Sequence, residues 1–333
     1  MAVCPYFGLS VLLLWLNCLF LQAQPKDVHT EGDDRMILAY SFYLKQKMSL
    51  DYVLARFPAL KEYVTNTTIE WNREFLSSVN TIDSILKTHL KDVWAKNKEA
   101  LYEKFIRVDN SGIEESQARQ FVDVVNDRSY GHIQSPIMET FLIWNPKYMK
   151  FPDKEFSEGY TCKFSTKDTH KSLPANVNII YPKSWLAVAG DNRTNIIENF
   201  ISGYGLGSVS MALSMEISKT NYTKDQLTLL LSKENMQKTL QSGSKVTGYE
   251  TDFTIDNCKA AAITYCSEKK EEDLKEICFV NKKYSCYYKN AILSLSFSIL
   301  SSDCDDVNKE FRKYQKLMKR ITDNIVILSQ WGQ

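Results

Sequence analysis

The sequence predicts an α+β protein: an all-helical N-terminal domain followed by an antiparallel β-sheet with packed helices. Apolar residues recur every three or four positions in the first half of the chain, and every second position in much of the second half. These spacings are typical of helices and strands, respectively. Of the eight cysteines, two lie within the first 23 residues and the others begin only at Cys162. Since 333 residues are enough for two domains, we expect a helical domain at 34–145 and a sheet domain at 157–327.

The chain begins with an apolar segment at 8–21, followed by Gln22, Ala23 and Gln24. This length, with a small residue at the end, is typical of an export signal, although no Lys or Arg precedes it. We therefore expect residues 1–23 to be a cleaved signal peptide, and the protein to be secreted or periplasmic with no stable membrane span. The alternative is an uncleaved anchor, because residues 5–23 could just cross a bilayer.

Helical periodicity extends from 34 to 145. A dense apolar run predicts a helix at 34–49, and Ser49-Leu50-Asp51 predicts the start of a second helix that ends at Pro58. The next helix carries a stripe with steps of three and four residues, made of Trp71, Phe75, Val79, Ile82, Leu86 and Leu90. A further helix is predicted at 91–108. The sequence 111–114 has a capping-box pattern for the helix after it, and Ser135-Pro136 opens a last helix that ends at Asn145-Pro146.

A charged linker with Pro152 is predicted at 147–159, and strands follow it. Alternation of apolar and polar residues predicts strands at 160–164, 177–181 and 209–217. A capped helix is expected from Thr223 to about residue 240. The region 249–300 is predicted to form three or four antiparallel strands, and 303–325 a strongly amphipathic helix.

The cysteines of 249–300 all stand at even positions, so neighbouring strands would place them on one face. A single register can oppose both cysteine pairs, and an even cysteine count in an exported chain favours disulfides. We therefore predict three bridges: Cys258–Cys286, Cys266–Cys278 and, by remainder, Cys162–Cys304. Reduced cysteines in the core are the alternative. A zinc site is disfavoured because the spacings are long and no histidine lies nearby.

No motif in the sequence specifies catalysis or a cofactor. The glycine-rich stretch 203–207 precedes a strand and not a helix, which argues against a phosphate loop. The weak candidates for a site are His132, Asp127, Arg128 and Glu139. A histidine base needs a positioned partner, and the sequence identifies none. We expect no cofactor or metal, and a net charge of +1 gives no reason to expect nucleic-acid binding.

The second half, 157–327, resembles the PsbP-like fold, which is named for an extrinsic subunit of photosystem II. The resemblance lies in Asn-Ile-Ile-Tyr-Pro-Lys-Ser-Trp at 178–185, in 256–265 and 288–298, and in the closing amphipathic helix. The whole chain also looks like uncharacterised exported proteins of Bacteroidetes. The cysteines depart from the family pattern. The resemblance implies an α/β sandwich and a non-enzymatic binding or assembly protein with an unknown protein or small-molecule partner. The alternative is a secreted hydrolase with a site at the interdomain cleft.

Overall fold

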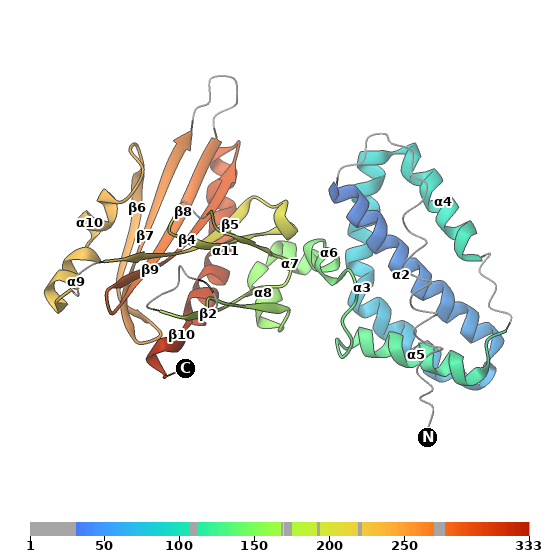
Figure 1. Ribbon diagram of the computed structural model, residues 1–333. Helices are drawn as coiled ribbons and strands as arrows, with labels where there is room; N and C mark the ends of the chain where they lie inside the picture. Colours follow the sequence, from blue (N-terminus) through green and yellow to red (C-terminus); the bar gives the residue numbers. More distant parts are fainter. Residues whose placement is uncertain are drawn as a thin grey trace.

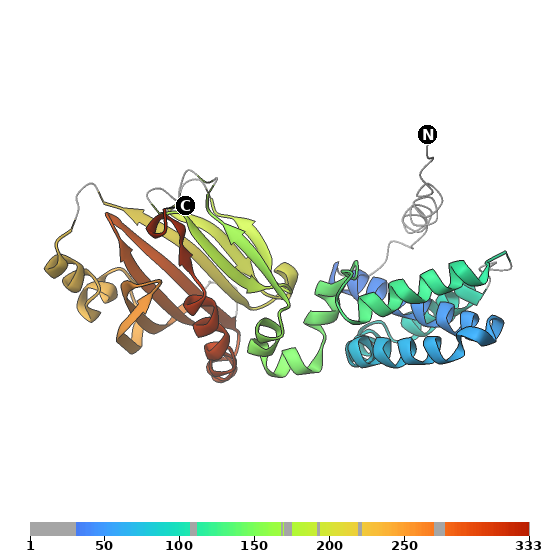
Figure 2. The ribbon, with the colours of Figure 1, turned by 90° about the horizontal axis from the view of Figure 1, so that it is seen from below.

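The protein consists of a helical part and a sheet part that lie side by side, with short helices between them (Figure 1). The view from below shows the same arrangement (Figure 2). This computed structural model describes residues 31–106, 112–167, 169, 175–191, 194–218, 222–269 and 277–332. The signal peptide predicted at 1–23 lies outside them. Within these ranges, none of the helices is both long and apolar enough to cross a membrane.

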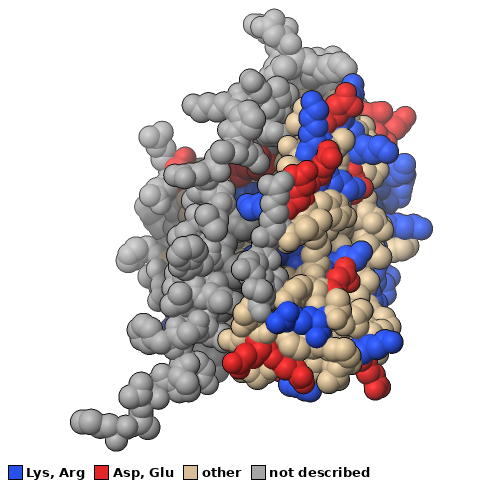
Figure 3. Space-filling view, turned by 90° about the vertical axis from the view of Figure 1, so that its right-hand side faces the viewer, with Lys and Arg blue, Asp and Glu red and all other residues tan. Residues whose placement is uncertain are grey.

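The helical part packs around α2 and α3, as the apolar stripe predicts. Trp71, Phe75, Val79, Ile82 and Leu86 of the stripe are all buried, and the Trp71 and Phe75 rings lie 4.3 Å apart. Pro58 follows α2 and begins the short turn η1 (Pro58–Leu60), where its missing N–H costs nothing. The elements are α2 (Glu31–Arg56), η1, α3 (Lys61–Leu90), α4 (Asp92–Ile106), α5 (Glu115–Ser129) and α6 (Met138–Ile143). Figure 3 shows the protein from the side of the helical part. Lys and Arg side chains are interspersed with Asp and Glu over the described surface, so neither positive nor negative charge dominates there.

Several helix boundaries differ from the sequence predictions. The two helices predicted before Pro58 are one helix, α2, and α6 begins at Met138 after Ile137 and not at Pro136. The cap of α5 is Glu114, which forms a reciprocal capping box with Gln117, whereas residue 111, where the sequence predicts the cap, lies outside the described residues. The single helix predicted from Thr223 is two helices, α9 (Lys224–Leu230) and α10 (Lys233–Lys238). Ser232 interrupts it, since its side chain accepts a hydrogen bond from the Asn235 N–H at 3.4 Å and starts a new helix.

The linker predicted at 147–159 is instead two short helices, α7 (Pro146–Lys150) and α8 (Pro152–Ser157). Each has proline at its first turn, where proline is favoured. The side chain of Asn145 caps α7 by accepting from the Lys147 N–H at 3.0 Å. The segment connects the two parts, and it is helical because proline begins each helix and Asp153 contacts Arg320 of α11.

The sheet part contains two antiparallel sheets, and with the helices this confirms the α+β prediction. A seven-stranded sheet has the order β3-β4-β5-β9-β8-β7-β6, and a three-stranded sheet has the order β1-β2-β10. Inward side chains from both sheets and from α11 (Cys304–Asp323) form one core, separate from the helical core. The strands are β1 (Thr161–Ser165), β2 (Val177–Pro182), β3 (Leu186–Ala189), β4 (Ile196–Ile201), β5 (Val209–Ile217), β6 (Lys245–Ile255), β7 (Cys258–Lys269), β8 (Ile277–Tyr288), β9 (Ala291–Ser301) and β10 (Val326–Ile327).

The other face of the large sheet is covered by α9 and α10 near β7, where Ala261 and Ile263 are fully buried. The edge strand β6 has two irregularities in its pairing with β7, and Asp252 there has a positive φ of 64°. Bulges and charges on an edge strand oppose pairing with another chain.

The four cysteines of the β7–β8 hairpin face one core, as predicted, but the predicted register and bridges are wrong. Cys286 lies opposite Ala260, and Cys278 opposite Glu268, so the hairpin is displaced by two residues. A shift of two keeps every side chain on its face, so the apolar pattern could not exclude it. The structure instead joins Cys278 to Cys304, with their Cα atoms 5.3 Å apart, because α11 begins just after β9, which pairs with β8. The thiols of Cys162, Cys258, Cys266 and Cys286 are free.

Candidate functional site at the joint between the two parts

The four catalytic candidates from the sequence do not form one site. His132 Nδ1 lies 3.3 Å from Asp127 Oδ1, and both side chains are exposed. Arg128 faces the helical core, with its guanidinium 5.6 Å from the centre of the Phe42 ring, and burial lowers its pKa. Glu139 lies on α6 and acts electrostatically on Cys162 of the sheet part. The structure therefore pairs Asp127 with His132 and places the other two elsewhere.

A network of hydrogen bonds centred on Ser184 lies where the two parts meet. This serine follows β2, in the stretch Tyr181-Pro-Lys-Ser-Trp185. Its N–H and hydroxyl donate to the two carboxylate oxygens of Glu155 at 2.8 and 2.7 Å. Its carbonyl accepts from the Tyr204 N–H at 2.7 Å. One residue thus binds both α8 and the loop between β4 and β5.

Tyr204 extends these contacts to the helical part. It lies in η3 (Gly203–Gly205) with φ 54° and ψ 42°, a left-handed conformation that is uncommon outside glycine. Its ring lies under the Arg35 guanidinium of α2, 4.5 Å from the ring centre. A cation over an aromatic face is attracted by the ring quadrupole. Glu155, Ser184, Tyr204 and Arg35 therefore form a continuous chain of contacts, which we call the joint.

Glu155 is the carboxyl of the joint, and its pKa is raised. Only 4% of its surface is exposed. Burial raises its pKa to about 7, and the hydrogen bonds from Ser184 oppose this rise without cancelling it. Both oxygens of this carboxyl are therefore already hydrogen-bonded within the protein.

Further contacts fix α8 and its neighbours. Asp153, 5% exposed, lies 3.5 Å from Arg320 Nε and 3.9 Å from Lys316 Nζ, both on α11. On the other side, the Tyr160 hydroxyl donates to Glu74 of α3 at 2.5 Å. Burial, with the bond to Glu74, raises the Tyr160 pKa. The joint is thus tied to α11 in the sheet part and to α3 in the helical part.

A second polar group lies in the core beside the joint. Cys162 of β1 is directly opposite Tyr181 of β2. Burial raises the pKa of the Cys162 thiol and that of Tyr181, the latter to about 12. Glu198 of β4 is 8% exposed, and burial raises its pKa as well. A thiol that is held in its neutral form is a poor nucleophile, since the thiolate is the reactive species.

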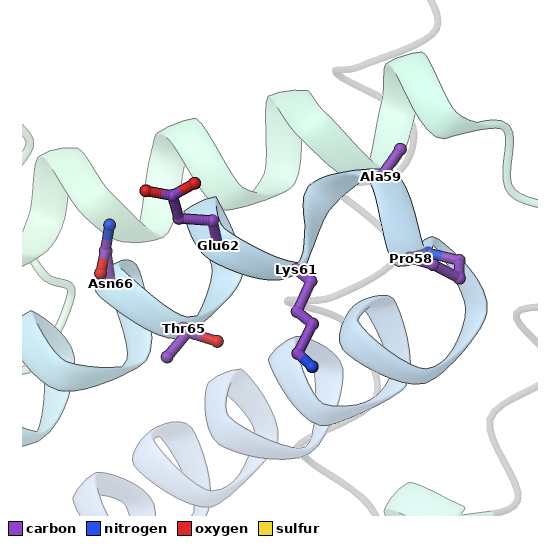
Figure 4. Close-up of a pocket in the computed structure, with 6 residues that line it drawn as sticks. All are labelled: Pro58, Ala59, Lys61, Glu62, Thr65 and Asn66. Atoms are coloured by element: carbon purple, nitrogen blue, oxygen red, sulfur yellow. The ribbon is translucent and has the colours of Figure 1, made fainter.

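A hollow of about 430 Å³ lies elsewhere, at the start of α3. All of its lining residues come from η1 and the first turns of α3, and their side chains point in different directions (Figure 4). They are Pro58, Ala59, Lys61, Glu62, Thr65 and Asn66. A binding site needs polar groups that converge on a ligand, so this hollow is a weaker candidate than the joint. In the part of the chain that the structure describes, no three His, Cys, Asp or Glu side chains gather as metal ligands.

Sequence reasoning missed the joint because its members are dispersed over the chain. Arg35 and Tyr204 lie far apart in sequence, and Glu155 fell in the predicted linker. The signal that could have found it is the Tyr-Pro-Lys-Ser-Trp stretch, which supported the PsbP-like resemblance and contains Ser184. A second signal is the pair of acids Asp153 and Glu155 directly after Pro152, a pattern typical of a helix start.

No protein-family model and no curated protein matches the chain. Among solved structures, PsbP from Synechocystis is 9% identical, with 50% of this chain and 92% of that chain covered and a TM-score of 0.34. LpqN from Mycobacterium tuberculosis, which is involved in cell envelope biogenesis, is 12% identical, with 53% and 96% covered and a TM-score of 0.33. A protein from Bacteroides thetaiotaomicron is 10% identical, with 45% and 44% covered and a TM-score of 0.27. PsbP is thus among the similar structures, as the resemblance of the second half predicts. Identities and TM-scores this low carry no conclusion about function.

Proposed function

We propose that the protein is an exported, non-enzymatic binding or assembly protein whose partner is an unknown protein or small molecule. The observation that supports this best is the joint, in which Glu155, Ser184, Tyr204 and Arg35 bind one another. Side chains engaged in this way connect the helical part to the sheet part. Connected parts lose less conformational freedom when they bind a partner, which favours a binding or assembly role.

Export is supported by the Cys278–Cys304 disulfide, because disulfides persist in oxidising compartments outside the cytosol. The expected signal peptide at 1–23 agrees with this. We therefore propose a secreted or periplasmic location in the cell envelope. The two separate hydrophobic cores support a division into domains at 34–145 and 157–327.

The alternative, a secreted hydrolase, is supported by one contact, the 3.3 Å approach of His132 to Asp127. The carboxylate could orient the imidazole as a general base. The exposure of both side chains weakens this proposal, since acid–base catalysis is aided by a water-excluding site.

Complementation of a strain that lacks the protein separates the two proposals. We expect a His132→Ala, Glu139→Gln double variant to restore the wild-type phenotype, and an Arg35→Ala, Tyr204→Ala double variant, which opens the joint, to fail. Both variants must accumulate at the wild-type level for the comparison to count. If the double variant at 132 and 139 accumulates normally but does not restore the phenotype, the hydrolase proposal is favoured and the binding or assembly proposal is refuted.

A further inference from the structure

Glu155 is a buried carboxyl within the contacts that hold the two parts together. It lies on α8, between the helical part and the sheet, and both of its oxygens are bound by Ser184. The same serine accepts from Tyr204, whose ring carries Arg35 of α2. A change in the charge of Glu155 therefore acts directly on the residue that links α8 to the helical part.

Among the described residues, no cation forms an ion pair with this carboxyl. Lys316 and Arg320 of α11 approach Asp153 instead, two residues earlier on α8. The groups that face it from α11 and β1 are Tyr314 and Cys162, and burial raises the pKa of both, so that neither carries charge at neutral pH. The titratable and charged groups near Glu155 include Asp153, Cys162, Lys183, Tyr314, Lys316 and Arg320, and Glu139 of α6 acts on the same Cys162. The Lys183 backbone also forms a hydrogen bond with the Glu155 carboxyl, which opposes the rise of its pKa.

We propose that Glu155 makes the joint sensitive to pH: the joint is closed when this carboxyl is protonated and loosens when it ionises. The protonated form keeps both contacts, because the Ser184 hydroxyl can accept from the carboxylic acid as well as donate to it. The ionised form places a negative charge in a buried site without a cation, which is unfavourable.

The sign of the effect follows from the two pKa values. In the closed joint the pKa of Glu155 is about 7, and in an open, hydrated joint it returns to its ordinary value of 4.5. The closed joint thus binds the proton more tightly, so its stabilisation is complete below pH 4.5 and is lost as pH rises to 7. The open population should increase over this window, by on the order of a hundredfold at most.

Hydrogen exchange of the intact protein at pH 5 and pH 8, corrected for the chemical exchange rate, tests the proposal. We expect amides of α8 and of the segment around Ser184 to exchange more readily at pH 8 through more frequent opening. In Glu155→Gln this pH step should disappear, because the amide keeps both contacts to Ser184 and cannot ionise. Glu158→Gln is the matched control: it removes a carboxylate of the same region that is paired with Lys147 and has a lowered pKa. It should keep the wild-type step.

Two results would overturn the proposal. One is a Glu155→Gln protein that retains the wild-type pH step. The other is a folded wild-type protein in which the α8 and Ser184 segments show the same opening at both pH values. The second comparison needs no variant, so the proposal can be refuted even when Glu155→Gln does not fold.

Discussion

The Cys278–Cys304 disulfide connects the start of β8 to the start of α11, and its removal should destabilise the sheet part. In the Cys304→Ser variant the bridge cannot form, while Asp303 still caps α11 by accepting from the Asp305 N–H at 2.9 Å. The helix should therefore persist, and the main loss is the cross-link. The thiol left at Cys278 is small and apolar enough to stay buried.

The loss can be calculated from the length of chain that the bridge closes. For a sequence separation of 26 residues, the chain-entropy relation gives about 3.5 kcal/mol at 25 °C. With a urea m-value of about 2–3 kcal/mol/M, the unfolding midpoint of the sheet part should fall by about 1 M or more. This is a large fraction of the stability of an ordinary domain.

Urea unfolding followed by tyrosine and tryptophan fluorescence measures the change. Cys162→Ser is the control, because Cys162 is a half-buried free thiol and its replacement breaks no disulfide. That variant should unfold within about 1 kcal/mol of the wild type. Reductant should lower the midpoint of the wild type and leave that of Cys304→Ser unchanged.

Peptide mapping of the unreduced protein gives the refutation. We expect one linked pair that joins the peptides of Cys278 and Cys304. Linked peptides that join Cys266 to Cys278 would show that the hairpin has the register with opposed cysteines, and would refute the register described above. An unchanged urea midpoint in Cys304→Ser would refute the energetic argument.

Three further predictions concern other contacts. The Asp256 carboxylate accepts hydrogen bonds from the Ile327 N–H at 2.6 Å and from the Trp331 Nε1–H at 3.2 Å. Asp256→Ala should therefore lower the free energy of unfolding by about 1–3 kcal/mol, measured in urea. An unchanged midpoint would contradict this. Trp94→Ala should increase hydrogen exchange throughout α4, since Trp94 is the one buried residue of that helix in the described chain; protection equal to the wild type would show that α4 is held otherwise. His132→Ala should change the unfolding free energy by less than about 0.5 kcal/mol, because its side chain is exposed; a larger loss would mean that the contact with Asp127 is structural.

The elements that the sequence predicted well are those with a long local period. The stripe from Trp71 to Leu86 and the amphipathic helix α11 repeat every three or four residues over several turns, and a pattern of that length has one structural solution. The shared face of the hairpin cysteines was likewise fixed by their even spacing.

The features that could not be predicted depend on contacts between distant segments. The observed hairpin register differs from the predicted one by two residues, and both registers place the same side chains on the apolar face. The disulfide partner Cys304, which follows β9, is a contact that the local pattern does not show. The helices α7 and α8 are too short to form by themselves. They depend on Asp153 meeting α11 and on Glu155 meeting Ser184, which no local pattern shows.

The proposed scaffold, whose two parts are connected by the joint, should be found bound to its partner. The native mass of the protein in a gently solubilised envelope fraction measures this. The scaffold proposal predicts that the chain migrates with a partner, above the mass of the mature chain alone, and that the Arg35→Ala, Tyr204→Ala variant loses this partner while remaining folded. A wild-type chain found in the cytosol with reduced Cys278 and Cys304, or one whose complex is indifferent to the joint, would contradict it.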